Sequence, residues 1–354
     1  MQRCNSPRIQ RVLERIVARE RLTRDEVFEF LEEIKLGKAS PVQVGGLLIG
    51  LVMKGVDADE LSAISEWMRD NAVHVKPKIN ETIIDTCGTG GGLLTFNVST
   101  ATALVAASAN VPVAKHGSRS ISHKTGSADV LERLNVKINL TKAQAERLIE
   151  ETNFTFLFAP LFHPMMHKIL GPEQELGVKT IFYTLIGPLI NPALVKAHVL
   201  GVYRRELVEP VAYVLAKLGY TKALVVHGVD GLDEISNIGK TLIAEVQNGK
   251  LYDVYEVTPE DFGVSKSKAS DLAPEVDSPE YNAELIVKLL KGSKFDTAKR
   301  DLLLLNSAGA LYVGERVKCL KDGLEYARNI VDEGAPYRKL EEVAEASKRL
   351  VSYE

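Results

Sequence analysis

The sequence predicts an α/β fold, in which a small N-terminal helical domain precedes a large domain with a mainly parallel sheet flanked by helices. Residues 8–72 place apolar side chains three and four positions apart, which is the spacing of amphipathic helices. Beyond them, short apolar or β-branched runs alternate with helical stretches, which favours a parallel sheet covered on both faces. The polar, proline-bearing segment 74–80 separates the two patterns. We therefore expect a helical domain over residues 1–77, with helices near 163–186 packing on it, and an α/β domain over residues 78–354.

Helix start signals support the small domain. Side chains suited to capping stand at Thr23, Ser40 and Asp57, and acidic residues or a proline follow each of them. The pattern predicts helices over residues 9–17, 25–37, 40–55 and 57–72.

The large domain shows strand and helix patterns in alternation. We expect strands over residues 82–87, 111–117, 136–140, 154–160, 197–203 and 223–229, separated by helices over residues 100–110, 127–134, 142–153 and 205–219. Residues 278–354 are expected to be mainly helical. Because ligands of parallel sheets bind beyond the carboxyl ends of the strands, the loops that follow the strands are the first place to look for a site.

Composition limits the class of protein. The 354 residues are 45% hydrophobic and 26% charged, with a formal net charge of −3, so there is no electrostatic case for nucleic acid. The three cysteines, Cys4, Cys87 and Cys319, are too few and too scattered for a disulfide framework, which fits a reducing compartment. The sequence contains no membrane-spanning stretch and no secretory signal. We expect a cytoplasmic protein without a membrane or nucleic-acid partner.

A glycine-rich turn follows the first expected strand of the large domain. Four of the five residues from 88 to 92 are glycine, and Asn97, Ser99 and Thr100 follow at the start of an alanine-rich helix. Glycine lets the backbone approach a ligand, and a helix start offers N–H groups to an anion. The spacing matches neither the P-loop nor the dinucleotide-binding motif. The segment is therefore interpreted as a phosphate-binding loop, with a plain tight turn as the alternative.

Two further polar loops follow strands and can face the same crevice. Residues 115–120 carry two cations, a histidine and hydroxyl groups, and the alternative is a solvated basic loop. Residues 230–234 are acidic and suit Mg²⁺ beside phosphate, unless they form a solvated turn. His163 and His167 have the spacing of a zinc-binding pair, but no further ligand stands near them in the sequence.

Together these segments resemble anthranilate phosphoribosyltransferases, and the wider class of phosphoribosyltransferases and pyrimidine nucleoside phosphorylases with the same fold. The likeness covers nearly the whole chain. The resembling motifs are, in order, GTGG at 88–91, TFNVST at 95–100, KHG-x-R at 115–119, GSADVLE at 126–132, FLFAP-x-FHP at 156–164, LGVKT at 176–180, GPL-x-NP at 187–192 and DG-x-DE-x-S at 230–236.

The resemblance implies transfer of the 5-phosphoribosyl group from phosphoribosyl pyrophosphate to an aromatic amine, with anthranilate of tryptophan biosynthesis as the expected acceptor. Pyrophosphate leaves with Mg²⁺, and no covalent catalytic residue is expected. The implied donor-binding residues are Gly88, Thr89, Gly90, Gly91, Thr95, Asn97, Ser99, Thr100, Lys115 and Ser127. The implied acceptor-binding residues are Gly88, His116, Ser118 and Glu173, and the implied metal-binding residues are Ser99, Asp233 and Glu234. The family also implies a homodimer formed through the N-terminal helices.

Four departures from the family pattern concern mainly the acceptor. Ser118 replaces an asparagine, and Glu173 replaces the arginine that would clamp the anthranilate carboxylate. Two carboxylates about 4 Å apart repel by roughly 4 kcal/mol at an effective dielectric constant near 20. The glycine loop is one residue shorter and lacks a lysine before Thr95, whereas the segment 182–187 is one residue longer and lacks an asparagine.

These departures leave several functions open. One is the same donor with another nitrogen acceptor. Another is ordinary anthranilate activity with Lys168 or Lys179 replacing the arginine. A nucleoside phosphorylase and a non-catalytic nucleic-acid-binding relative are further alternatives. The acidic pair Asp233 and Glu234 argues against the phosphorylase, and the net charge of −3 argues against nucleic acid.

Overall fold

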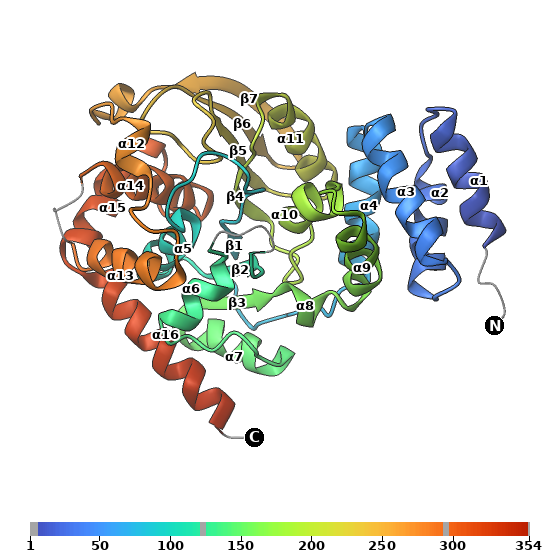
Figure 1. Ribbon diagram of the computed structural model, residues 1–354. Helices are drawn as coiled ribbons and strands as arrows, with labels where there is room; N and C mark the ends of the chain where they lie inside the picture. The colour runs from blue at the N-terminus through green and yellow to red at the C-terminus, as the bar shows by residue number, and fades with distance from the viewer. Residues whose placement is uncertain (1–5, 121–124, 293–296, 353–354) are drawn as a thin grey trace.

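The computed structural model describes residues 6–120, 125–292 and 297–352, and it has a helical domain beside a larger domain built on a sheet (Figure 1). The predicted fold class is confirmed. The helical domain contains α1 (Pro7–Val17), α2 (Arg24–Lys35), α3 (Pro41–Lys54) and α4 (Ala58–Asp70). Of these, α4 packs on the large domain, while α1 and α2 lie farther out.

The predicted helix caps of the small domain are confirmed. Thr23, Ser40 and Asp57 each accept a hydrogen bond from a backbone N–H in the first turn of the helix that follows. In each case the third helical residue returns a bond to the cap, which completes a capping box. Local sequence therefore determines where these helices begin.

A single seven-stranded sheet forms the centre of the large domain, in the order β3-β2-β1-β4-β5-β6-β7. The first five strands are parallel, and β6 and β7 form an antiparallel hairpin at one edge. The strands are β1 (Ile84–Asp85), β2 (Val113–Gly117), β3 (Phe154–Phe158), β4 (Ala197–Gly201), β5 (Lys222–Gly228), β6 (Thr241–Gln247) and β7 (Lys250–Val257).

The predicted strand over residues 136–140 is wrong. Val136, Ile138 and Leu140 are buried and their neighbours are exposed, so the alternation is real, but the segment pairs with no strand. It lies against the last helix, where the backbone N–H of Lys137 donates to Ser347 Oγ at 3.0 Å. Packing of this extended segment on a helix buries every second side chain, which gives the same two-residue period as a strand in a sheet.

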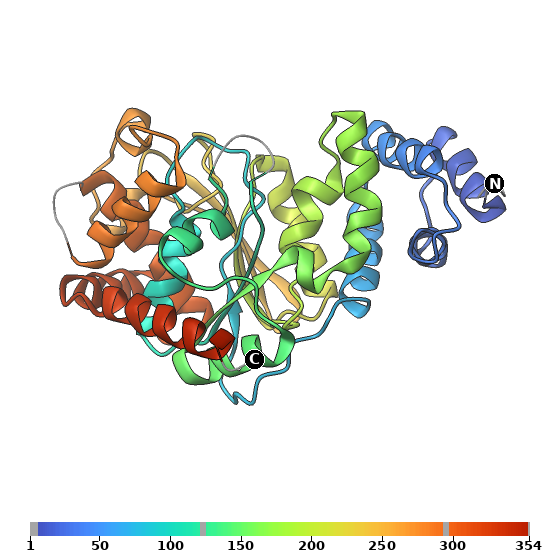
Figure 2. The same ribbon diagram turned by 60° about the horizontal axis from the view of Figure 1, so that its bottom comes forward.

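Helices cover both faces of the sheet (Figures 1 and 2). They are α5 (Val98–Ser108), α6 (Ser127–Arg133), α7 (Lys142–Thr152), α8 (Ala159–Phe162), α9 (His167–Leu176), α10 (Gly187–Leu189), α11 (Val208–Lys217), α12 (Ala269–Leu272), α13 (Pro279–Leu290), α14 (Thr297–Val313), α15 (Leu320–Asp332) and α16 (Ala335–Ser352). Short 3₁₀ turns span Pro164–Met166, Arg205–Leu207 and Pro259–Phe262, and a π-helix spans Phe182–Ile186. In the described ranges, no helix has the length and apolarity to cross a membrane.

Two hydrophobic cores lie on opposite faces of the sheet. In β5, Leu224 and Val226 belong to the core under α5 and α14, whereas Ala223 and Val225 belong to the core under α11 and the helical domain. This alternation follows from the pleat of the strand. Helix α9 packs on α3, so the segment near residues 163–186 lies against the small domain.

Candidate functional site

A cavity of about 1160 Å³ opens at the carboxyl ends of the parallel strands. Its walls come from the glycine loop, the start of α5, the loop after β2, the acidic turn after β5 and the π-helix. Strands distant in sequence end side by side at this edge, which brings the three polar loops together as the sequence predicted.

The glycine loop is fixed by the end of β4 and by the acidic turn that follows β5. The N–H of Thr89 donates to Gly201 O at 2.9 Å, and the N–H of Gly90 donates to Asp233 Oδ2 at 2.8 Å. A Cβ atom at Gly92 would stand 2.6 Å from the carbonyl oxygen of Gly231, so only glycine fits there. The loop thus packs its backbone directly against the acidic turn.

Helix α5 presents an uncapped start to the cavity. Asn97 occupies the N-cap position, but its side chain donates to Thr125 O at 2.9 Å instead of capping the helix. Ser99 Oγ, in the first turn, accepts a hydrogen bond from Lys115 Nζ at 3.1 Å. A helix start beside a cation suits an anionic group.

Strand β2 directs two predicted site residues to opposite sides. Lys115 points toward α5, where it contacts Ser99, and His116 points the other way, where its Nδ1 lies 3.0 Å from Gly187 O. Both side chains are buried, and both line the cavity. One strand therefore serves two different halves of the same cavity.

Below the glycine loop lies a buried polar cluster centred on Asp85. Its carboxylate accepts hydrogen bonds from the backbone of Thr86 and from the amide of Asn191, both at 2.7 Å. Burial raises the pKa of Asp85, but His198, Lys115 and Asn191 outweigh burial, so the pKa lies below its ordinary value. Burial lowers the pKa of Lys115, and the carboxylate of Asp85 opposes that shift. The pair supports a cation at the cavity floor.

The acidic turn has the ligands that a magnesium ion needs. Asp233 and Glu234 line the cavity, and Thr95 Oγ1 donates to Glu234 Oε1 at 3.3 Å. Glu234 Oε2 is buried and has no hydrogen-bond partner among the residues that the structure describes. Burial, followed by the charge of Asp233, raises the pKa of Glu234 well above its ordinary value. Adjacent carboxylates with an unpartnered oxygen fit a hard divalent cation.

Most of the predicted site residues line this one cavity. They are Gly88, Thr89, Gly90, Gly91, Thr95, Asn97, Ser99, Lys115, His116, Ser118, Ser127, Asp233 and Glu234. Two predicted residues, Thr100 and Glu173, are buried outside the cavity wall. Glu173 Oε1 instead accepts a hydrogen bond from the backbone N–H of Thr180 at 2.5 Å.

The π-helix and the three residues before it form one wall of the cavity. Thr180, Tyr183 and Thr184 line the cavity, together with Lys179 just before them. Lys179 Nζ lies 5.0 Å from the centroid of the Tyr183 ring. A π-turn contains one residue more than an α-turn, and this one falls on the segment that the family resemblance led us to expect to be one residue longer. The expected extra residue is the sequence signal that could have indicated this wall of the cavity.

Two cations considered for the acceptor end differ in position. Lys179 lines the cavity, whereas Lys168 Nζ donates to the backbone oxygen of Lys35 at 2.5 Å and is absent from the cavity wall. Tyr203 and Arg204 after β4 also line the cavity and were not singled out from the sequence.

In the part of the chain that the structure describes, His163 and His167 belong to no metal-compatible grouping, whereas Cys87 belongs to one. His163 packs edge-on against His116, with ring centroids 5.0 Å apart, and burial lowers the pKa of His163 well below its usual range. In the described part of the chain, the metal-compatible grouping is Asp85, Cys87 and His198, which does not include His163 or His167. Cys87 and Cys319 are unbridged, and Cys4 lies outside the described residues.

Comparison with known proteins assigns both parts of the chain. Residues 80–337 match the a/b domain of the glycosyl transferase family, and residues 10–72 match its helical bundle domain. The curated anthranilate phosphoribosyltransferase of Thermoanaerobacter sp. (strain X514) is 46% identical over 97% of this chain and 99% of its own length.

Two solved structures are similar over the full fold. The anthranilate phosphoribosyltransferase of Thermus thermophilus has a TM-score of 0.87 and 37% identity, covering 95% of this chain and 99% of that one. The Saccharomyces cerevisiae enzyme in complex with PRPP and Mg has a TM-score of 0.86 and 25% identity, covering 98% and 99%. The cavity, its polar loops and these similarities agree, and the chain belongs to the anthranilate phosphoribosyltransferase family.

Proposed function

We propose that this protein transfers the 5-phosphoribosyl group of phosphoribosyl pyrophosphate to the amino nitrogen of anthranilate and releases pyrophosphate, a step of tryptophan biosynthesis. The observation that carries the proposal is the meeting of the glycine loop, the start of α5, buried Lys115 and two adjacent carboxylates at one cavity. A diphosphate needs N–H donors and cations, and its Mg²⁺ needs carboxylates. Family membership supports the same reaction.

The donor half of the cavity has separate partners for each part of the donor. In this proposal the backbone of residues 88–91, with the Thr89 hydroxyl, binds the pyrophosphate. Thr95, Asn97 and Ser99 bind the ribose and its phosphate, and Lys115 and Ser127 contact phosphate oxygens. Thr100 is not proposed to contact the donor. Its backbone N–H donates to Asn97 O at 3.1 Å in the first turn of α5.

Ser99, Asp233 and Glu234 are the proposed magnesium-binding residues. The unpartnered Oε2 of Glu234 is the observation that fits a cation there. Mg²⁺, when bound, neutralises charge on the pyrophosphate as it leaves. The role of this chain is to hold the carboxylates beside the glycine loop, through the bond between Gly90 and Asp233.

The acceptor is proposed to bind between His116, Ser118 and the π-helix. Lys179 is the proposed partner of the acceptor carboxylate, because it lines the cavity. Glu173 is not part of the cavity wall, and its Oε1 accepts a hydrogen bond from the backbone N–H of Thr180, so in this proposal the Glu173 carboxylate does not contact the acceptor. This favours anthranilate over an acceptor bearing a second amine.

Catalysis in this arrangement depends on positioning and electrostatics. The aromatic amine is neutral and attacks C1 of the ribose with inversion, so no strong base is needed. Lys115 and the backbone N–H groups of the glycine loop hold the donor and stabilise the charge that develops on the leaving group. Burial lowers the pKa of His116, so its imidazole is a neutral wall of the acceptor pocket rather than a cation.

A homodimer formed through the helical domain is part of the proposal. Val42 and Met53 of α3 are 84% and 70% exposed, and Leu176 at the end of α9 and Val178 after it are also exposed. Neighbouring exposed apolar side chains commonly mark an interface. Light scattering should give twice the chain mass of 38.9 kDa, and Met53→Lys should lower it toward that mass. The domain boundary near residue 77 and a cytoplasmic location remain predictions.

The reaction can be tested with purified protein, anthranilate, phosphoribosyl pyrophosphate and Mg²⁺. Consumption of anthranilate with equimolar release of pyrophosphate, and its loss when Mg²⁺ is chelated, is the expected result. A parallel reaction with pyrimidine nucleosides and inorganic phosphate tests the phosphorylase alternative. Turnover in that reaction, with none on anthranilate, would contradict the proposal.

A further inference from the structure

A second cavity, of about 580 Å³, lies between the helical domain and the α/β domain. Small-molecule sites usually have volumes of about 300–1,000 Å³, so this cavity is large enough for a ligand. Its walls come from the start of α2, one face of α4, the end of α11 and the segment before β4. The lining residues are Leu22, Arg24, Asp59, Ser62, Ala63, Glu66, Arg69, Asp70, Leu194, Lys196, Lys217 and Leu218.

Arg69 is the unusual member of this wall. The residue is only 5% exposed, and its Nη1 is buried without a hydrogen-bond partner. Within residues 6–120, 125–292 and 297–352, the guanidinium group makes no ion pair and no hydrogen bond, although it lies 5.3 Å from the centroid of the Tyr220 ring. A buried guanidinium group carries five N–H donors and a positive charge. Burial without hydrogen-bond acceptors or a counter-charge lowers the stability of the folded protein.

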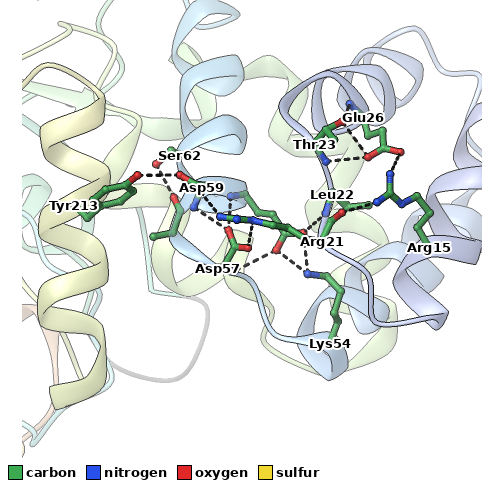
Figure 3. Close-up of polar contacts among 12 residues, drawn as sticks. Arg15, Arg21, Leu22, Thr23, Glu26, Lys54, Asp57, Asp59, Ser62 and Tyr213 are labelled. Atoms are coloured by element: carbon green, nitrogen blue, oxygen red, sulfur yellow. Dashed lines mark hydrogen bonds and ion pairs between the residues drawn. The ribbon is translucent and has the colours of Figure 1, made fainter.

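Most of the other charges in this cavity already have partners. Arg24 binds Glu66 through two hydrogen bonds of 2.9 and 2.8 Å. Lys217 Nζ lies 2.6 Å from Asp59 Oδ1. Asp59 also accepts a hydrogen bond from the Tyr213 hydroxyl at 3.1 Å and forms an ion pair with Arg21 (Figure 3). These pairs neutralise Asp59 and Glu66, so those carboxylates are not available to Arg69.

Lys196 stands on the other side of the cavity and is also unpaired. Its Nζ donates only to Leu218 O, at 3.4 Å, and no carboxylate of the described chain forms an ion pair with it. Burial, followed by the positive charge of Arg69, lowers the pKa of Lys196, so the two cations repel each other. Asp70, which is exposed, is the one carboxylate among the described lining residues that forms no ion pair. The described wall of the cavity therefore has two unpaired cations and one unpaired anion.

We propose that this cavity binds a small organic anion, whose phosphate or carboxylate group lies between Arg69 and Lys196 and whose apolar part packs on Leu22, Leu194 and Leu218. Arg69 belongs to the helical domain and Lys196 to the α/β domain, so the anion bridges the two. An oxyanion in the cavity would supply the guanidinium group with the charged acceptor that it lacks. The site is separate from the reaction cavity and does not depend on the transferase reaction.

The test compares anion binding to the native protein and to matched variants. Inorganic phosphate and butyrate are titrated separately at constant ionic strength, and affinity is taken from the shift in the melting temperature. The variants are Lys196→Gln and Arg69→Gln, with Lys250→Gln on exposed β7 as the control. Phosphate that binds the glycine loop affects all of them equally, so the difference between variants isolates the second cavity.

We expect Lys196→Gln to weaken binding of at least one anion about tenfold, which corresponds to the loss of about 1.4 kcal/mol, while Lys250→Gln leaves it unchanged. A response to phosphate alone identifies a phosphate-bearing ligand, and a response to butyrate alone identifies a carboxylate. Lys196 is exposed, so that variant is informative even if Arg69→Gln does not fold. Equal affinities of the native protein and Lys196→Gln for both phosphate and butyrate would overturn the proposal.

Discussion

The backbone N–H of Gly90 donates a 2.8 Å hydrogen bond to Oδ2 of Asp233, 143 residues away in the sequence. This bond joins the loop that is proposed to hold the pyrophosphate to the turn that is proposed to hold Mg²⁺. The carbonyl of Gly231 also accepts from the N–H of Leu93, at 2.9 Å. A substitution that moves the glycine loop should therefore also move the acidic turn, and the reverse.

The close contact at Gly92 gives a first prediction. In Gly92→Ala, the new Cβ would meet Gly231 O at 2.6 Å and Asp233 Oδ1 at 2.9 Å, so the loop must move away from the acidic turn. We expect the KM for phosphoribosyl pyrophosphate to rise at least about tenfold, as for the loss of one well-placed contact of about 1.4 kcal/mol. Gly171→Ala is the control, because a Cβ there meets nothing within 4 Å. Equal KM values in the two variants would count against a rigid junction.

Glu234→Gln separates metal binding from stability. The variant removes a buried carboxylate whose pKa is raised by burial and by Asp233, so the free energy of unfolding should stay the same or rise. The Mg²⁺ concentration that gives half-maximal activity should increase at least about tenfold, because a charged ligand is lost. Denaturant unfolding and a Mg²⁺ titration of the rate provide the two measurements. An unchanged Mg²⁺ requirement would remove Glu234 from the metal site.

Lys179 and Lys168 provide a matched pair for the acceptor. Lys179→Ala should raise the KM for anthranilate about tenfold or more and leave the KM for the donor unchanged, because a cation–carboxylate contact is worth about 1.5–3 kcal/mol. Lys179→Arg should retain most of the affinity. Lys168→Ala removes a cation of the same type outside the cavity wall and should change neither KM. If both alanine variants behave alike, the acceptor carboxylate has a different partner.

Three buried histidines predict how stability depends on pH. Burial lowers the pKa of His116, His163 and His198 in the folded protein, whereas in the unfolded chain each titrates near its ordinary value of about 6.5. Below that pH the unfolded state binds more protons, so stability falls as pH falls. Each histidine contributes a slope of about 1.4 kcal/mol per pH unit until its folded pKa is reached.

Denaturant unfolding at pH 7.5, 6.5 and 5.5 measures this slope. His163→Asn should reduce it by about one histidine's share, about 1.4 kcal/mol per pH unit, whatever the variant does to absolute stability. A slope that is the same in the variant and the native protein would show that His163 is not a neutral buried group.

Local signals in the sequence predicted the helices and the loops, and long-range packing explains the errors. The caps at Thr23, Ser40 and Asp57 depend on neighbouring residues only, so they could be recognised. The β6–β7 hairpin was not predicted, although Asn248 and Gly249 between its strands are a strong turn signal and both have positive φ. The strand predicted over residues 136–140 was wrong because α16, distant in sequence, supplies its burial.

The main parts of the site were predicted, because each polar loop directly follows a strand in the sequence and can be recognised from local residues. The position of Glu173 could not be predicted, since it depends on the bond that the carboxylate makes to Thr180. The role proposed for Lys179 likewise depends on how the chain continues into the π-helix.

The π-helix over Phe182–Ile186 has a consequence for how such a protein can diversify. A chain that takes up one additional residue inside a single turn keeps the elements on either side in register. An insertion at this position would change the outline of one wall, where Tyr183 and Thr184 line the cavity, and would leave the opposite wall intact. Small insertions and deletions in this turn would therefore change the selectivity for the proposed acceptor and leave binding of the proposed donor unchanged.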